Sequence, residues 1–170
     1  MTFLAIARRL DSEDRPVEAA DAYEDALRCS EKGVSMDTYV DLAVLYFVCN
    51  DGGCAAHHHL PQSFLERAWN RMFQLPADAE VKFGKHPELA FWPRYFEYFW
   101  LNGKPFTEDC IAMVADGQTL VPYFYLYAFT DTEDVTAHVV ELRHQVELGP
   151  TAKARYIRSV LDAALEQRKL

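Results

Sequence analysis

The stretch VEAADAYEDALR, residues 17–28, decides the fold class of this chain. Its apolar side chains recur at the three- and four-residue spacing of one helix face: Val17, Ala20, Tyr23 and Leu27. Charged residues fill another face, and Pro16 suits the first turn of a helix, where a missing N–H removes no hydrogen bond. The stretch is therefore predicted to form an amphipathic helix.

A second helix of the same kind precedes it. The apolar face of this helix consists of Phe3, Ile6, Ala7 and Leu10. Two amphipathic helices joined by a short turn bury their apolar faces against each other. Residues 1–28 are therefore predicted to form a helical hairpin.

Helical patterns continue along the rest of the chain. They are predicted over residues 38–47, 63–75, 93–102, 108–116, 120–129, 133–148 and from 151 onward, with candidate N-caps at Asp14, Ser63, Thr107 and Thr130. Pro76 is expected to end one helix, so that residues 76–87 form a connection. Pro93 is expected in the first turn of the next helix.

Residues 120–129 fit two structures. Tyr123, Tyr125 and Tyr127 alternate with other apolar residues, as they would in a buried strand. A single strand has no obvious partner elsewhere in the chain, so a buried helix after Pro122 is favoured. The sequence thus predicts one all-α domain of about nine helices, built from stacked antiparallel helical hairpins.

The small and aromatic residues of the first hairpin follow a specific order. Ala19, Tyr23 and Ala26 have the spacing small–x₃–aromatic–x₂–Ala. A second copy begins 36 residues after Phe3, with Tyr39, Leu42, Ala43 and Tyr46. In these features the chain resembles the tetratricopeptide-repeat (TPR) family, whose repeats have a period of about 34 residues.

The resemblance covers residues 1–75, which would form two hairpins with residues 49–59 as an insertion between the helices of the second. Residues 88–170 would form degenerate helical pairs and a C-terminal capping helix. The resemblance implies an α-solenoid or helical bundle that binds other proteins, usually without catalysis.

Charge and composition exclude several classes of protein. The formal net charge of −9 excludes a general nucleic-acid binder, because phosphate binding needs clustered Lys and Arg. No apolar run approaches the roughly 18 residues of a membrane span. The four cysteines are too sparse for a disulfide-stapled secreted domain, and no secretory signal pattern is visible. A cytoplasmic protein with reduced thiols is expected.

The insertion CNDGGCAAHHH, residues 49–59, has two interpretations. Zinc binds cysteine and histidine, and the candidate ligand set is Cys49, Cys54, His57 and His59. Structural zinc sites, however, pair cysteines two to four residues apart and histidines three to five residues apart. A solvent-exposed insertion without metal, available for binding a partner, is the favoured interpretation.

Familiar catalytic motifs are absent from the sequence: a Walker loop, a dinucleotide glycine motif, a GxSxG elbow and an HExxH helix. A Cys–His pair that forms only in the fold is the alternative, with Cys110 beside His138 or His144. The favoured interpretation is a buried structural thiol at Cys110, a surface His144 and a His138 that is satisfied by its own neighbours. Neither catalysis nor a cofactor is predicted.

The predicted function is therefore non-enzymatic protein binding. The acidic first half favours a basic partner. In one predicted helix the aromatic residues outnumber those that a single helix face can bury, so some of them are expected to contact a partner. The candidate contact residues are Glu18, Asp21, Asp25, Asp51, His57, His58, His59, Tyr98 and Trp100. One specific form is an immunity protein that neutralises a cognate bacterial toxin. The alternatives are a chaperone or adaptor that binds a peptide in a groove, a metal-binding protein that uses residues 49–59, and a self-assembling scaffold.

Overall fold

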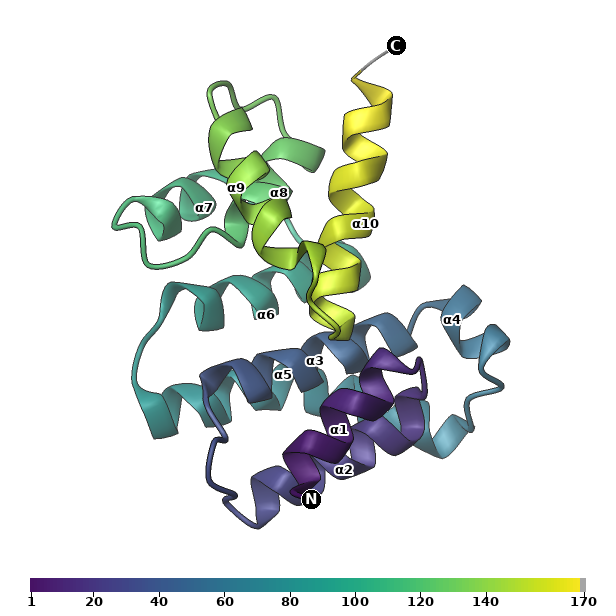
Figure 1. Ribbon diagram of the computed structural model, residues 1–170. Helices are drawn as coiled ribbons and strands as arrows, with labels where there is room; N and C mark the ends of the chain where they lie inside the picture. Colours follow the sequence, from purple (N-terminus) through teal and green to yellow (C-terminus); the bar gives the residue numbers. More distant parts are fainter. Residues whose placement is uncertain (169–170) are drawn as a thin grey trace. The chain divides into compact units, whose positions relative to one another are not determined.

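A computed structural model describes residues 1–168 (Figure 1). Within these residues the regular structure is ten α-helices and no strand, which confirms the all-α prediction. None of the described helices is both long enough and apolar enough to cross a bilayer. The chain divides into two compact units, the first with residues 1–85 and 150–153, the second with residues 86–149 and from 154 onward.

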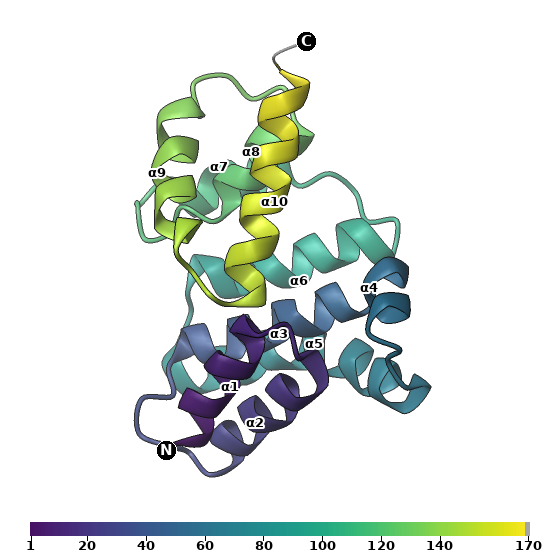
Figure 2. The same cartoon turned by 45° about the vertical axis from the view of Figure 1, so that its right-hand side comes forward.

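The first unit is built from two helix pairs. Its helices are α1 (Phe3–Ser12), α2 (Pro16–Arg28), α3 (Met36–Cys49), α4 (Gly52–His57) and α5 (Gln62–Phe83). α1 packs against α2, α3 packs against α5, and α2 also contacts α3 (Figures 1 and 2). The hairpin predicted for residues 1–28 is therefore present.

Small side chains allow the first pair of helices to pack closely. Ala7, Ala19 and Ala26 are fully buried, and Tyr23 on the same helix pair has none of its surface exposed. Tyr46 on α3 is also fully buried. The residues that carry the repeat-like spacing therefore form the core of the first unit.

The longest helix corrects the expected role of Pro76. The sequence pattern predicts a helix that ends at Leu75, but α5 continues through Pro76 to Phe83. A proline inside a helix removes a backbone hydrogen bond, and the burial of Leu75, Pro76 and Ala79 offsets that loss. The connection predicted over residues 76–87 is therefore mostly helical.

The N-caps also differ from those expected. The N-cap residue is Arg15 for α2, Pro61 for α5, Phe106 for α7 and Val135 for α9, so none of the four expected capping residues holds the N-cap position. Asp14 has a left-handed φ of 57° and lies in the turn before α2. Helix ends depend on backbone conformation over one or two residues, so hydrophobic spacing does not identify the capping residue.

The second unit contains the remaining helices. They are α6 (Pro87–Trp100), α7 (Thr107–Val114), α8 (Pro122–Phe129), α9 (Thr136–Glu147) and α10 (Ala152–Gln167), whose first two residues belong to the first unit. α6 begins at Pro87, so Pro93 lies inside the helix rather than in its first turn. Residues 122–129 are helical, which confirms the favoured interpretation of this segment.

Aromatic side chains form the core of the second unit. The ring centroid of Phe124 lies 5.5 Å from that of Phe91, 5.8 Å from that of Trp92 and 5.0 Å from that of Tyr95. All four residues are fully buried, and the Tyr95 hydroxyl lies 2.7 Å from the Tyr156 hydroxyl. The aromatic excess of α6 is therefore used largely for packing within its own unit.

Candidate functional site

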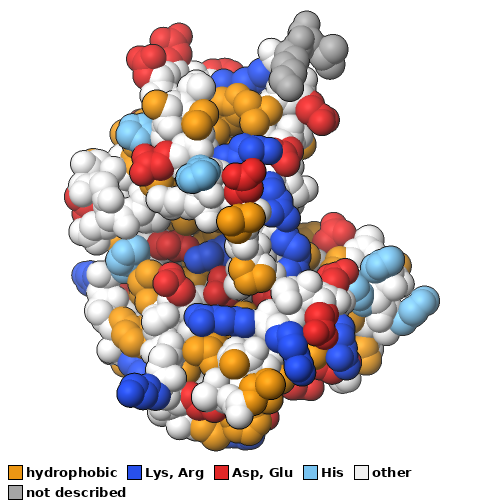
Figure 3. Space-filling view, viewed as in Figure 1, with side chains coloured by type: hydrophobic (Ala, Val, Ile, Leu, Met, Phe, Trp, Pro, Cys, Tyr) orange, Lys and Arg blue, Asp and Glu red, His pale blue; other side chains and the backbone are white. Residues whose placement is uncertain are grey.

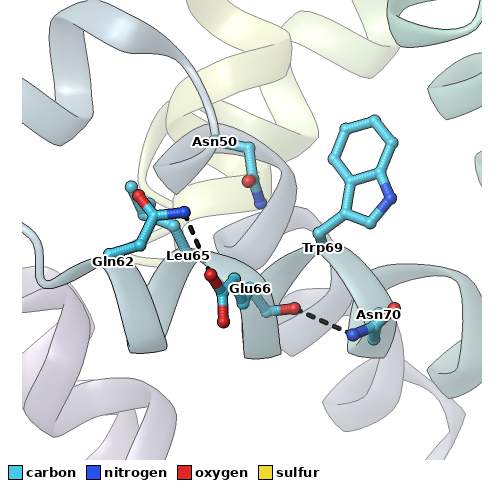
Figure 4. Close-up of a pocket in the computed structure, with 6 residues that line it drawn as sticks. All are labelled: Asn50, Gln62, Leu65, Glu66, Trp69 and Asn70. Atoms are coloured by element: carbon cyan, nitrogen blue, oxygen red, sulfur yellow. Dashed lines mark hydrogen bonds between the residues drawn. The ribbon is translucent and has the colours of Figure 1, made fainter.

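A pocket of about 370 Å³ opens beside α5 in the first unit (Figure 4). Its lining residues are Asn50, Gln62, Leu65, Glu66, Trp69 and Asn70. Five of them lie on one face of α5, because their positions repeat at three- and four-residue spacing. The sixth, Asn50, is the C-cap of α3 and faces them from that helix (Figure 4).

The polar groups of this pocket are oriented by hydrogen bonds within the chain. Asn50 Nδ2 donates to the Tyr46 carbonyl oxygen at 2.9 Å. Gln62 Nε2 donates to Glu66 Oε1 at 3.2 Å, and Asn70 Nδ2 donates to the Glu66 carbonyl oxygen at 3.1 Å. Each amide thus directs its nitrogen to a partner in the chain, so the amide oxygens and the Glu66 carboxylate are suited to accept hydrogen bonds from a ligand.

Leu65 and Trp69 add apolar surface to the same pocket. They lie one helical turn apart on α5, and both are half-buried. The Trp69 ring packs edge-on against Phe73, with 5.9 Å between the ring centroids. The pocket therefore combines a packed apolar strip with hydrogen-bond acceptors, a combination that fixes the orientation of a bound molecule.

The acidic candidates on α2 pair with arginines of the first unit. Glu18 accepts a hydrogen bond from Arg15 at 2.8 Å, and this bond lowers the pKa of the Glu18 carboxyl. The other two pairs are Asp25 with Arg28 at 2.6 Å and Asp21 with Arg67 of α5 at 2.7 Å. Their charges are thus largely compensated within the chain, which weakens the case for this face as the surface that attracts a basic partner.

Residues 51–59 form a short helix and a turn. Asp51 Oδ1 accepts hydrogen bonds from the N–H groups of Gly53 at 2.9 Å and Cys54 at 3.2 Å, so this candidate contact residue caps α4. The exposed His57 ends the helix, and the exposed His59 has a left-handed φ of 51°. Figure 3 shows histidine side chains at the surface near α4.

The structure brings together a different ligand set from the candidate zinc set. Within residues 1–168 it groups His57 with His58 and Asp14, and neither cysteine belongs to that group. Cys49 is fully buried, and its hydrogen bond with Cys54 together with burial raises the pKa of the Cys49 thiol. A raised thiol pKa opposes formation of the thiolate that zinc binds.

The aromatic candidates Tyr98 and Trp100 are half-buried in the second unit. The Tyr98 ring centroid lies 5.3 Å from that of Tyr125 and 6.2 Å from that of Phe106. These contacts use part of the surface that Tyr98 would otherwise offer to a partner. The pocket beside α5 is therefore the stronger candidate site.

The three Cys–His candidates have different surroundings in the second unit. Burial raises the pKa of the Cys110 thiol to about 12. The His138 ring stacks on Tyr123 with 4.4 Å between centroids, and His144 Nδ1 lies 3.6 Å from Glu147. The buried Cys110 and the stacked His138 therefore fit structural roles, whereas His144 lies at the surface.

Sequence reasoning placed Leu65 and Trp69 on a helix but did not assign them to a site. A signal was present, because Gln62, Glu66 and Asn70 recur every four residues beside these apolar positions. The contribution of Asn50 depends on how α3 ends beside α5, which helical spacing does not reveal. Comparisons of the chain with protein-family models, with curated proteins and with solved structures give no match.

Proposed function

We propose that this chain is a non-enzymatic protein-binding module and that the pocket beside α5 binds a segment of a protein partner. The single observation that carries the proposal is the combination of apolar surface from Leu65 and Trp69 with acceptor groups around it. Acceptors require a ligand that donates hydrogen bonds, and the Glu66 carboxylate favours a donor with positive charge. The expected segment therefore places a Lys or Arg beside an apolar side chain.

The extent of the pocket suits a peptide. Its α5 residues run from Gln62 to Asn70, which corresponds to about 12 Å along a helix axis. An extended peptide covers that length with about four residues, each contributing backbone N–H donors for the amide oxygens. The net charge of −9 adds a long-range attraction for a basic partner.

The helix pairs of the first unit support the same function by analogy with the repeat family that residues 1–75 resemble. A basic segment of a bacterial toxin is one partner of this chemistry, which corresponds to an immunity protein. A basic client segment of a chaperone or adaptor is another. Both bind without a chemical step.

A peptide-display selection tests the proposal directly. Random peptides of twelve residues are selected on the purified full chain, and the dissociation constants of enriched peptides are measured by fluorescence anisotropy. We expect enriched sequences to carry Lys or Arg next to an aliphatic or aromatic residue. Binding is expected to weaken as salt is raised, because part of the attraction is electrostatic.

Matched variants on α5 separate the pocket from the rest of the helix. Leu65→Ala and Glu66→Gln are expected to weaken binding about tenfold and about fivefold, respectively, because each removes one kind of contact. Glu80→Gln makes the same change, and Val81→Ala a similar truncation of an aliphatic side chain, at exposed positions of α5 outside the pocket, so both variants should bind as the wild type does. Equal affinities for all four variants, or enriched peptides without cationic residues, would contradict the proposal.

A further inference from the structure

Three side chains from two separate turns of the first unit converge at its surface. They are Asp14, in the turn between α1 and α2, His57, the last residue of α4, and His58, the C-cap of α4. One ligand atom from each lies within 4.8 Å of the others. His58 Nε2 and Asp14 Oδ2 are 3.4 Å apart, and the two imidazole centroids are separated by 4.7 Å.

Backbone hydrogen bonds hold both turns in place. The Asp14 N–H donates to the Asp11 carbonyl oxygen at 3.1 Å, in the turn where Asp14 has its left-handed φ. On the other side, the His58 N–H donates to the Cys54 carbonyl oxygen at 3.1 Å, while Asp51 caps the start of α4. The His58 side chain is only 18% exposed, so its position is further limited by packing.

We propose that Asp14, His57 and His58 form a binding site for one divalent transition-metal ion of the zinc class. Two imidazoles and one carboxylate are the donor types that Zn²⁺, Co²⁺ and Ni²⁺ accept. Bonds of about 2.0 Å in tetrahedral geometry place ligand atoms roughly 3.3 Å apart. Rotation of the exposed Asp14 and His57 side chains supplies the remaining approach, and water completes the coordination.

This site is independent of the pocket beside α5, with which it shares no residue. A bound ion would link the α1–α2 turn to the end of α4. Its expected effect is therefore a more stable first unit, because a ligand that binds only the folded state favours that state. The role assigned to the ion is structural, and no catalytic step is attached to it.

Titration of tag-free protein tests the site. Zn²⁺ binding is followed by calorimetry and Co²⁺ binding by visible absorption, with circular dichroism to check that each variant is folded. We expect one equivalent of metal to bind and to raise the melting temperature. Asp14→Asn and His58→Ala should each weaken binding at least tenfold, since each removes a ligand while Asn still tolerates the left-handed backbone at position 14.

His59→Ala is the matched control, because His59 is adjacent in sequence but lies outside the converging set. It should bind metal with wild-type affinity, as should Cys54→Ser. An equal loss in His59→Ala and His58→Ala, or unchanged affinity in Asp14→Asn, would show that the histidine run alone binds the ion and would overturn the proposed site. No binding at millimolar metal would overturn it as well.

Discussion

The backbone N–H of Ala152 donates a bifurcated hydrogen bond to the Asp11 carboxylate, at 3.0 Å to Oδ1 and 3.1 Å to Oδ2, across 141 residues of sequence. Ala152 is the first residue of α10, where backbone N–H groups have no partner within the helix. Asp11 is only 1% exposed, and the Tyr23 hydroxyl donates to its Oδ2 at 3.4 Å. A side chain of α1 thus satisfies the start of the last helix and fixes residues 150–153 in the first unit.

Asp11→Ala is expected to lower the free energy of unfolding by about 2–3 kcal/mol, because it leaves a buried N–H and a buried hydroxyl without their acceptor. Asp11→Asn keeps one oxygen acceptor and should lose less. Glu13→Ala, at an exposed position nearby, should change stability by less than about 0.5 kcal/mol. Urea denaturation measures all three, and wild-type stability in Asp11→Ala would refute the anchoring role.

Asp41 gives the first unit a specific dependence on pH. Burial raises the pKa of its carboxyl to about 6, against the attraction of Lys153 and a hydrogen bond from Thr151, while Asp11 and Asp37 add to the increase. Because this value lies above the ordinary 3.8, the folded state holds the proton more tightly, and the stability from Asp41 is lost as pH rises through 6. Between pH 4.5 and 7.5 the loss amounts to about 2 kcal/mol.

The measurement is the free energy of unfolding of the wild type minus that of Asp41→Asn, taken by chemical denaturation across this range. The difference should fall as pH rises. Asp37→Asn serves as the control, because Asp37 lies near the same Lys153 ammonium but is 62% exposed. A difference that stays constant with pH for Asp41→Asn would refute the prediction.

Gly103 is expected to tolerate no larger residue. A Cβ at this position would lie 2.8 Å from the Glu97 carbonyl carbon and oxygen and from Tyr98 Cα, all of them backbone atoms. Gly103→Ala should therefore destabilise the second unit by about 2 kcal/mol, as overpacking does elsewhere. In Gly52→Ala the new Cβ meets no atom within 4 Å, and Gly52 is the first residue of α4, so this variant should be neutral or slightly stabilising. Equal melting temperatures for the two variants would contradict this assignment.

The four thiols should react in an order set by burial. Cys29 is exposed, whereas Cys49 and Cys110 are buried and have raised pKa values, so they expose little thiolate near neutral pH. In the native protein an aromatic disulfide reagent should modify Cys29 first, then the half-buried Cys54. Mass spectrometry of the products over time checks the order. Rapid modification of Cys110 without denaturant would contradict it.

The fold class followed from short-range patterns. The helix after Pro122 was predicted because a single strand would have no partner, but the 17–28 stretch and its preceding helix are helical where the spacing of apolar residues predicted helices. Such spacing is a property of residues three and four positions apart, and a helix satisfies its backbone within the same short range. The path of α5 through Pro76 was not predictable in this way, because burial of the surrounding residues compensates the local penalty.

The sequence by itself therefore determined an all-helical protein with a compact helical hairpin at its start. The tertiary structure alone decided that Asp11 meets Ala152, that Asp14 meets His58, and that Asn50 joins the α5 face in one pocket. Each of these relationships joins separate helices or turns. Their geometry depends on how buried faces pack over long chain separations, and no local periodicity encodes which donor reaches which acceptor.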